Sequence, residues 1–84
     1  MAFKILPHAR KRMKERKITV ETVEKAISFP DKQQKDRTHS RRLLAKKLIS
    51  IANKPYLLLV VFEQNYKDIT VVTVITTSKI LKYL

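Results

Sequence analysis

The sequence contains no glycine and no cysteine among its 84 residues. Without glycine it cannot form the glycine-rich loops that hold phosphates in P-loop and Rossmann nucleotide-binding proteins, so those function classes are excluded. Without cysteine it has neither a disulfide framework nor a thiolate metal site. Its two histidines, with acids scattered among Lys and Arg, do not favour a structural zinc site. We therefore expect no metal and no cofactor.

Acidic residues are also scarce, because seven Asp and Glu stand against nineteen Lys and Arg, which gives a net charge of +12. A balanced network of surface ion pairs would need more acids. The positive field favours a polyanionic partner such as nucleic acid, the ribosome or an acidic protein segment. The alternative is a basic domain whose charge serves only its solubility.

Long apolar runs are absent as well. No stretch approaches the roughly 20 apolar residues of a membrane-spanning helix, and the N-terminus lacks the pattern of a signal peptide. We therefore expect a cytoplasmic protein with no membrane partner. The length predicts a single domain over residues 1–84.

Two short helices are predicted over about residues 7–28. In the first helix, Ala9 and Met13 are the apolar residues that point one way. Thr19 suits the N-cap of the second helix, and Pro30 ends it because the residue before a proline disfavours helix. The second helix has the longer apolar face, formed by Val20, Val23, Ala26 and Ile27.

The second half of the chain is rich in strand-forming residues. Residues 56–63 are a continuous apolar run that is typical of a central strand. Residues 69–77 are rich in β-branched side chains, and residues 65–68 between the two runs predict a hairpin turn. Helices followed by strands predict an α+β fold, with an antiparallel sheet and helices on one face.

Four other segments are less determined by their pattern. Residues 2–6 fit a leading strand or an extended arm, and residues 31–40 fit a polar loop or an exposed edge strand. Residues 78–84 form a tail with room for one helical turn. Residues 41–52 fit a helix or a strand, and periodicity alone does not decide between them.

The most basic stretch is residues 8–17, which hold six of the nineteen Lys and Arg and one acid. On a helix, His8 and Arg12 lie one turn apart on one flank, and Arg16 follows one turn later. Arginine donates two parallel hydrogen bonds to a phosphate, and histidine titrates near neutral pH. The three residues therefore predict a phosphate clamp with an acid–base neighbour. The alternative is structural, with His8 capping the helix and the arginines pairing with Glu24.

A second basic segment covers residues 32–47. Along a strand, Arg37, His39 and Arg41 would share one face and could contact RNA, whereas the alternative is a solvated polar loop. Lys46 and Lys47 would point to opposite faces. One of these lysines therefore lies with apolar residues, either as a snorkelling side chain or as a phosphate ligand.

The opening motif His8-Ala9-x-x-Arg12-Met13-x-x-Arg16-x-Ile18, followed by Val23, Ile27 and Phe29-Pro30, resembles a small prokaryotic family of domains of unknown function. That family is commonly grouped with the RelE/ParE toxin superfamily. The ending Val-Thr-Val-Ile-Thr-Thr with its Ser-Lys-Ile-Leu-Lys-Tyr tail is similar too. The resemblance implies two N-terminal helices packed on a three- to four-stranded antiparallel sheet, with strand rather than helix over residues 41–48.

The resemblance also implies a toxin-like role in a toxin–antitoxin pair. RelE-type relatives cut mRNA without metal, often on the ribosome, and use Lys, Arg, His or Tyr side chains. This implies a metal-independent endoribonuclease or an RNA binder directed to the ribosome, with an acidic antitoxin protein as a second partner. The alternatives are a non-catalytic nucleic-acid-binding module and a protein-interaction domain, and a homodimer is a further option.

Tyr83, with Lys79 and Lys82, matches the C-terminal position where RelE-like enzymes often carry a functional Tyr or Arg. The alternative is that Tyr83 closes the edge of the core. The candidate residues follow from these arguments. The candidate catalytic residues are His8, Arg12, His39 and Tyr83. The candidate nucleic-acid-binding residues are Arg10, Arg16, Arg37, Arg41, Arg42, Lys46, Lys47, Lys79 and Lys82.

Overall fold

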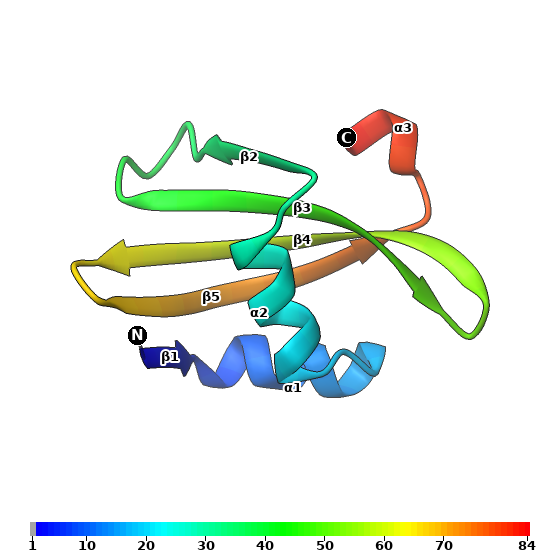
Figure 1. The fold of residues 1–84 in the computed structure, drawn as a ribbon, viewed down its shortest axis with the longest axis horizontal. Coiled ribbons are helices and arrows are strands. Elements are labelled where there is room, and N and C mark those ends of the chain that lie inside the picture. Colours follow the sequence, from blue (N-terminus) through cyan, green and yellow to red (C-terminus); the bar gives the residue numbers. More distant parts are fainter. Residues whose placement is uncertain (1) are drawn as a thin grey trace.

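The computed structural model describes residues 2–84, which form an α+β fold (Figure 1). The elements in chain order are β1 (Ala2–Ile5), α1 (Pro7–Arg16), α2 (Val20–Ser28), β2 (Lys32–Lys35), β3 (Arg42–Ile51), β4 (Lys54–Asn65), β5 (Asp68–Thr77) and α3 (Ile80–Tyr83). The two N-terminal helices, the β4–β5 hairpin and the single helical turn in the tail confirm the expectations from the sequence.

The sheet has five strands in the order β1-β5-β4-β3-β2. β1 runs parallel to β5, and the other neighbours are antiparallel. The expectation of a three- to four-stranded antiparallel sheet was therefore wrong in two respects, the number of strands and the direction of β1. Both edge strands have only four residues, and β2 is wholly exposed, so neither produces a periodic apolar signal.

Residues 42–51 form a strand, as the resemblance implied for residues 41–48. β3 pairs along its whole length with β4, from Arg42 opposite Glu63 to Ile51 opposite Lys54. A helix here would leave one side of β4 without a hydrogen-bonding neighbour. Strand pairing therefore decides what the local pattern left open.

The chain forms its tight turns without glycine. Ala52 and Asn53 connect β3 to β4 with φ values of 51° and 65°, and Tyr66 between β4 and β5 has a φ of 57°. Two residues with positive φ in a two-residue hairpin loop match the type I′ turn, which fits the twist of the strands. The left-handed conformation costs a non-glycine residue roughly 1–2 kcal/mol. Tyr66 lies within the turn predicted at residues 65–68, whereas no turn was predicted at Ala52.

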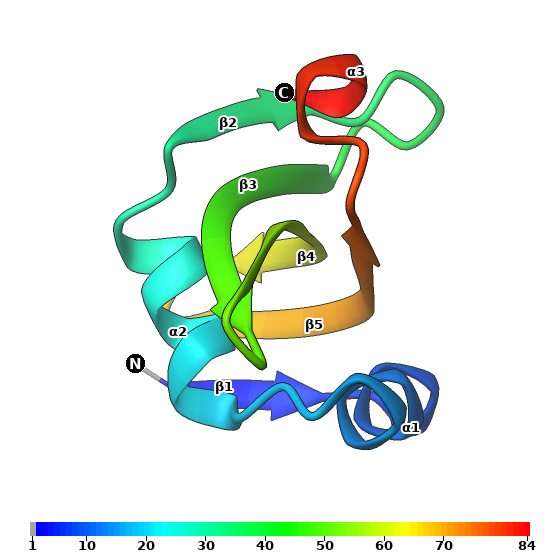
Figure 2. The same cartoon turned by 90° about the vertical axis from the view of Figure 1, so that its right-hand side faces the viewer.

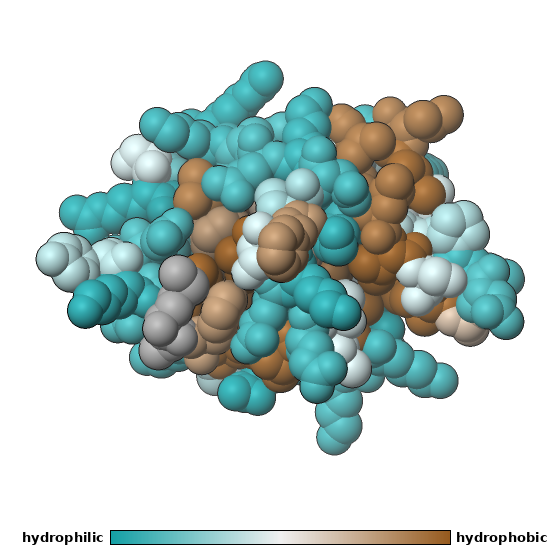
Figure 3. Space-filling model, viewed as in Figure 1, coloured by the Kyte–Doolittle hydropathy of each residue, from teal (hydrophilic) through white to brown (hydrophobic). Residues whose placement is uncertain are grey.

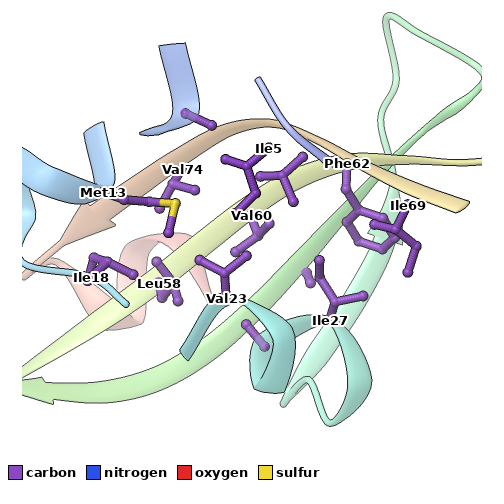
Figure 4. Packing of buried hydrophobic residues seen from close by; sticks show 14 residues of the cluster. Ile5, Met13, Ile18, Val23, Ile27, Leu58, Val60, Phe62, Ile69 and Val74 are labelled. Carbon is purple, nitrogen blue, oxygen red and sulfur yellow. The ribbon is translucent and has the colours of Figure 1, made fainter. Parts of the chain in front are cut away.

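The core lies between the sheet and the two helices (Figure 4). α1 contributes only Ala9 and Met13 as buried residues, as its thin apolar face predicted. Phe62 of β4 is 1% exposed and is the largest fully buried side chain. The remaining members labelled in the figure are Ile5, Ile18, Val23, Ile27, Leu58, Val60, Ile69 and Val74.

The ends of α2 are fixed by local hydrogen bonds. The Thr19 side-chain oxygen accepts from the backbone N–H of Thr22 at 3.1 Å, which confirms the predicted N-cap. The helix closes where the Phe29 N–H donates to the Lys25 carbonyl at 2.8 Å. Among residues 2–84, no helix is both long and apolar enough to cross a membrane.

Figure 2 shows that the sheet curves, with α1 beside β1 and β5 and α3 near the opposite end of the sheet. The strand order explains this separation, because α1 packs along β5 while α3 folds back toward β3 and β2. β4 lies between these two regions. The fold therefore distributes the basic side chains over distinct surfaces.

Candidate nucleic-acid interface

The main candidate site is a cleft of about 400 Å³ between α1 and β5, here called the α1–β5 cleft. One wall consists of His8, Arg12 and Arg16, and the other consists of Thr73, Val74, Ile75 and Thr76. The four-residue spacing places one side chain per helical turn on the first wall. The cleft thus brings together the three residues that the sequence predicted as a phosphate clamp.

The buried face of α1 holds this wall in place. Ala9 is 0% and Met13 is 5% exposed, and the flank that carries His8, Arg12 and Arg16 lies directly beside this buried stripe. The helix ends at Arg16, and the left-handed φ of 58° at Lys17 turns the chain so that the Ile18 N–H donates to the Met13 carbonyl at 2.8 Å. The N-cap is Leu6, without a side-chain hydrogen bond, so His8 does not cap the helix.

The polar groups of the cleft are open to a ligand. His8, Arg12 and Arg16 are exposed, and none of the side-chain hydrogen bonds within residues 2–84 involves them. Two guanidinium groups supply planar pairs of donors that match a phosphate. The half-buried Thr73 and Thr76 add hydroxyl groups on the facing wall.

A second cleft of about 380 Å³ adjoins the first. Its lining is Leu59, Ile75, Thr76, Thr77 and Tyr83, so Ile75 and Thr76 belong to both clefts. The Tyr83 side chain is 42% exposed, and Lys82 Nζ lies 5.4 Å from the centroid of its ring. Tyr83 therefore lines a cleft that adjoins the α1–β5 cleft.

The segment around His39 does not join this site. The expectation that Arg37, His39 and Arg41 share a strand face was wrong, because β2 ends at Lys35 and β3 begins at Arg42. The connection is a compact loop that bends at Arg37 and Thr38 and turns at Ser40 and Arg41.

Hydrogen bonds within the loop replace the alternation of a strand. The Asp36 carboxylate accepts from the Thr38 hydroxyl at 2.7 Å and from its N–H at 2.9 Å. These bonds, the hydroxyl bond first, lower the pKa of Asp36. The Arg42 N–H donates to the His39 carbonyl at 3.0 Å.

The loop borders a separate cleft of about 290 Å³. Its lining is Thr38, His39, Ser40, Arg41, Arg42 and Glu63, and no residue is common to this cleft and the α1–β5 cleft. In Figure 1 the loop lies at the far side of the sheet from α1. The two basic segments therefore form two surfaces instead of one shared site.

Lys46 and Lys47 extend to opposite faces of β3, as predicted. Lys46 is 8% exposed, and its Nζ donates to the Tyr83 carbonyl. The pKa of Lys46 is lowered, mainly by burial of the ammonium group and to a smaller degree by the positive charge of Lys32. Lys47 Nζ donates to the Phe29 carbonyl at 2.8 Å. Both lysines thus bind backbone carbonyls of the chain itself.

The remaining candidates lie outside the α1–β5 cleft. Arg10 is exposed on α1 but does not line the cleft. Lys79, the N-cap of α3, and Lys82, within α3, are both exposed. Sequence reasoning missed Thr73 and Thr76, for which the only signal was two hydroxyl residues within a β-branched run.

Comparison with known proteins identifies the family of the chain. Residues 5–76 match the model of a domain of unknown function, DUF4258. The chain belongs to the DUF4258 family. No curated protein and no solved structure matches the chain. The predicted membership in a family of domains of unknown function is thus confirmed, whereas no comparison links the chain to the RelE/ParE toxins.

The matched range divides the candidate residues. It includes both walls of the α1–β5 cleft, from His8 to Thr76. It ends before α3, so Tyr83 and its neighbouring lysines lie beyond the matched residues. The α1–β5 cleft therefore belongs entirely to the DUF4258 domain.

Proposed function

We propose that this DUF4258 domain binds single-stranded RNA and holds a phosphate in the α1–β5 cleft. The observation that carries the proposal is the joint lining of one cleft by His8, Arg12 and Arg16 opposite two threonines. Guanidinium and hydroxyl groups contact phosphate oxygens, and the net charge of +12 draws the polyanion toward the protein.

Tyr83 favours a single strand over a duplex. Single-stranded sites combine a positive groove for the backbone with aromatic side chains on which bases stack. Tyr83 is exposed in the cleft that shares Ile75 and Thr76 with the α1–β5 cleft. A nucleotide whose phosphate contacts Arg12 and Arg16 would have its neighbour's base within reach of Tyr83.

Two matched double variants test this proposal. Arg12→Gln with Arg16→Gln removes two positive charges from the cleft, and Arg37→Gln with Arg41→Gln removes two from the β2–β3 loop. Fluorescence anisotropy with a labelled RNA of about 12 nucleotides measures the Kd. The cleft variant should weaken binding by about tenfold or more, and the loop variant by much less. Equal losses would show that binding follows net charge alone and would overturn the proposal.

RNA cleavage is a second candidate function, and the placement of His8 beside Arg12 in one cleft favours it. In metal-free cleavage a base removes the 2′-hydroxyl proton, the 2′ oxygen attacks phosphorus, and the 5′ oxygen leaves with a proton. His8 suits the proton transfer, and Arg12 suits the charge of the phosphorane. His39 lines a different cleft and is not proposed as its partner.

Cleavage is tested with purified protein, mRNA and EDTA, with and without ribosomes. The expected product carries a 2′,3′-cyclic phosphate, and His8→Gln should remove it while the Kd for RNA stays within about twofold. A DNA strand of the same sequence should stay intact because it lacks the 2′-hydroxyl. No product from the wild-type protein under any condition, and no growth arrest on expression, would leave an RNA-binding module without catalysis.

A further inference from the structure

The outer edge of β3 continues beyond the strand that covers it. β2 pairs with β3 only from Leu43 to Lys46, whereas β3 extends to Ile51. Within residues 2–84, no strand pairs with Lys47–Ile51 on the side away from β4. An edge of this kind presents backbone N–H and C=O groups to an added strand.

The hydrogen bonds next to this edge show which groups point outward. Asp31 N–H donates to the Lys46 carbonyl at 2.8 Å, and the Leu48 N–H donates to the Asp31 carboxylate at 2.7 Å. Because outward groups alternate along a strand, the next outward residue is Ser50. Ser50 lies opposite Pro55 of β4, which has no N–H to offer. The Ser50 N–H and C=O therefore point away from β4, and Ser50 is exposed.

A groove of about 290 Å³ lies beside this edge, between β3 and the start of α2. Its apolar lining is Ile18, Ile49 and Ile51, and its cationic lining is Lys17, Lys25 and Lys47. No Asp or Glu lines it. Figure 3 shows hydrophobic side chains gathered toward the end of the molecule where α3 and the last part of β3 lie, whereas hydrophilic side chains cover most of the rest of this face. We call this feature the lysine groove.

We propose that the lysine groove and the Ser50 edge bind an extended peptide that carries both apolar and acidic side chains and adds a strand to β3. The backbone of the peptide would pair with Ser50 and the Leu48 carbonyl, and Asp31, which occupies the Leu48 N–H, would mark the end of the added strand. One apolar side chain would enter between Ile49 and Ile51. Acidic side chains two positions away from it, on the same face of the added strand, would meet Lys17 and Lys25. Lys47 already donates to the Phe29 carbonyl and would contribute its charge alone.

A peptide fits this surface better than RNA does. RNA has no backbone that alternates N–H and C=O groups at the spacing of a strand, so it would leave the Ser50 edge unpaired. The apolar lining contributes little to a phosphate backbone. Lys17 and Lys25, with the charge of Lys47 beside them, then select acidic over basic peptides, because like charges across an interface oppose binding.

The probe for this proposal is a fluorescein-labelled peptide of about ten residues in which Ile and Glu take turns at every second position with Thr between them, so that Ile and Glu share the face toward the groove. Two matched peptides are the controls. In one, alternate backbone nitrogens are methylated, which blocks strand pairing and keeps the charge, and in the other Lys replaces Glu. We expect both controls to bind at least about tenfold more weakly. Equal binding by the methylated peptide would overturn the strand addition, because only charge and apolar contact would remain.

Two substitutions at one position test the edge from the protein side. Ser50→Pro removes the outward N–H and leaves the β4 hydrogen bonds in place, whereas Ser50→Ala keeps the N–H. Only Ser50→Pro should weaken peptide binding, by about tenfold, and circular dichroism checks that both variants fold. An unchanged Kd for Ser50→Pro would contradict the proposal.

Amide NMR of the wild-type protein provides a readout that needs no variant. Peptide binding should shift the Ser50 amide signal and slow its hydrogen exchange, because the N–H becomes bonded. An unchanged exchange rate in the peptide-saturated protein would contradict strand addition. Displacement of the peptide by RNA, together with weaker RNA binding by Lys25→Gln, would assign the lysine groove to nucleic acid and overturn the proposal.

Discussion

The basic side chains of the α1–β5 cleft and those beneath α3 differ in what they contact. In the cleft, Arg12 and Arg16 are exposed on a helix flank. Beneath α3, Lys46 Nζ donates to the Tyr83 carbonyl, and Lys32 Nζ donates to the Leu84 carbonyl at 3.3 Å. The same positive charge is open to a ligand in one place and bound to the protein's own backbone in the other.

The geometry of β2 and β3 explains the contact beneath α3. Lys32 and Lys46 are register partners on neighbouring strands, so their side chains lie on the same face. The last carbonyls of α3 have no partner within the helix and accept these bonds. A count of basic residues therefore overstates the surface that is free to bind RNA.

The largest expected effect separates the two regions by stability. Lys46→Ala removes a buried side chain and its bond to the Tyr83 carbonyl, so we expect it to lower the free energy of unfolding by about 1–3 kcal/mol. Arg12→Ala on the exposed flank should change it by no more than about 0.5 kcal/mol. Thermal unfolding followed by circular dichroism measures both. A loss for Arg12→Ala as large as that for Lys46→Ala would show that the cleft arginines are structural.

Local sequence pattern was sufficient to predict some helices and strands of the fold but not others. The helices were predicted because Thr19 is a capping residue and because Pro30 stops a helix. The β4–β5 hairpin was predicted because two strongly β-prone runs flank a short polar turn. β1 and β2 could not be assigned in the same way, because each has four residues and takes its strand conformation from its pairing with β5 or β3.

The candidate site was predictable to a similar degree. The joint position of His8, Arg12 and Arg16 follows from helical spacing, and the structure gives them a common cleft. The facing Thr73 depends on how α1 packs against β5, which no local pattern encodes. His39 was placed on a strand face because alternation was assumed through residues that form a loop. The roles of Lys46 and Lys47 depend on carbonyls far away in the sequence.

A stabilising substitution outside the α1–β5 cleft tests whether protein stability and RNA binding vary independently. Ala52 holds a φ of 51° in the β3–β4 turn, which glycine adopts without the clash of a Cβ. Ala52→Gly should therefore raise the free energy of unfolding by about 0.5–1 kcal/mol, which corresponds to a rise in Tm of roughly 2–8 °C.

RNA binding provides the control for that substitution. The Kd of Ala52→Gly for RNA should not change, since Ala52 does not line the α1–β5 cleft. A changed Kd would mean that stability alone alters binding. Losses of binding in the other variants would then need correction for stability.

The salt dependence of RNA binding also separates the arginines of the α1–β5 cleft from the lysines beneath α3. For single strands, the slope of log K against the logarithm of the salt concentration is negative, and its magnitude decreases by about 0.7 for each phosphate contact that is lost. Arg12→Gln should reduce the slope by about that amount. Lys46→Met should leave it unchanged because its ammonium group binds the Tyr83 carbonyl. Anisotropy titrations at several salt concentrations provide both slopes, and a reduced slope for Lys46→Met would place that lysine on the RNA.

The smallest expected effect concerns pH, because only Lys46 in this comparison has a lowered pKa, mainly through burial. Below its folded pKa, Lys46 carries its proton in both the folded and the unfolded state, and the cost of burying the charge is present in full. As the pH rises from the folded pKa toward the unfolded value near 10.5, the unfolded state holds more protons, so stability rises. Denaturant unfolding from neutral to alkaline pH should therefore show that the free energy of unfolding of the wild type rises relative to that of Lys46→Met. A constant difference between the two proteins over this range would mean that the Lys46 ammonium is hydrated and that α3 does not bury it.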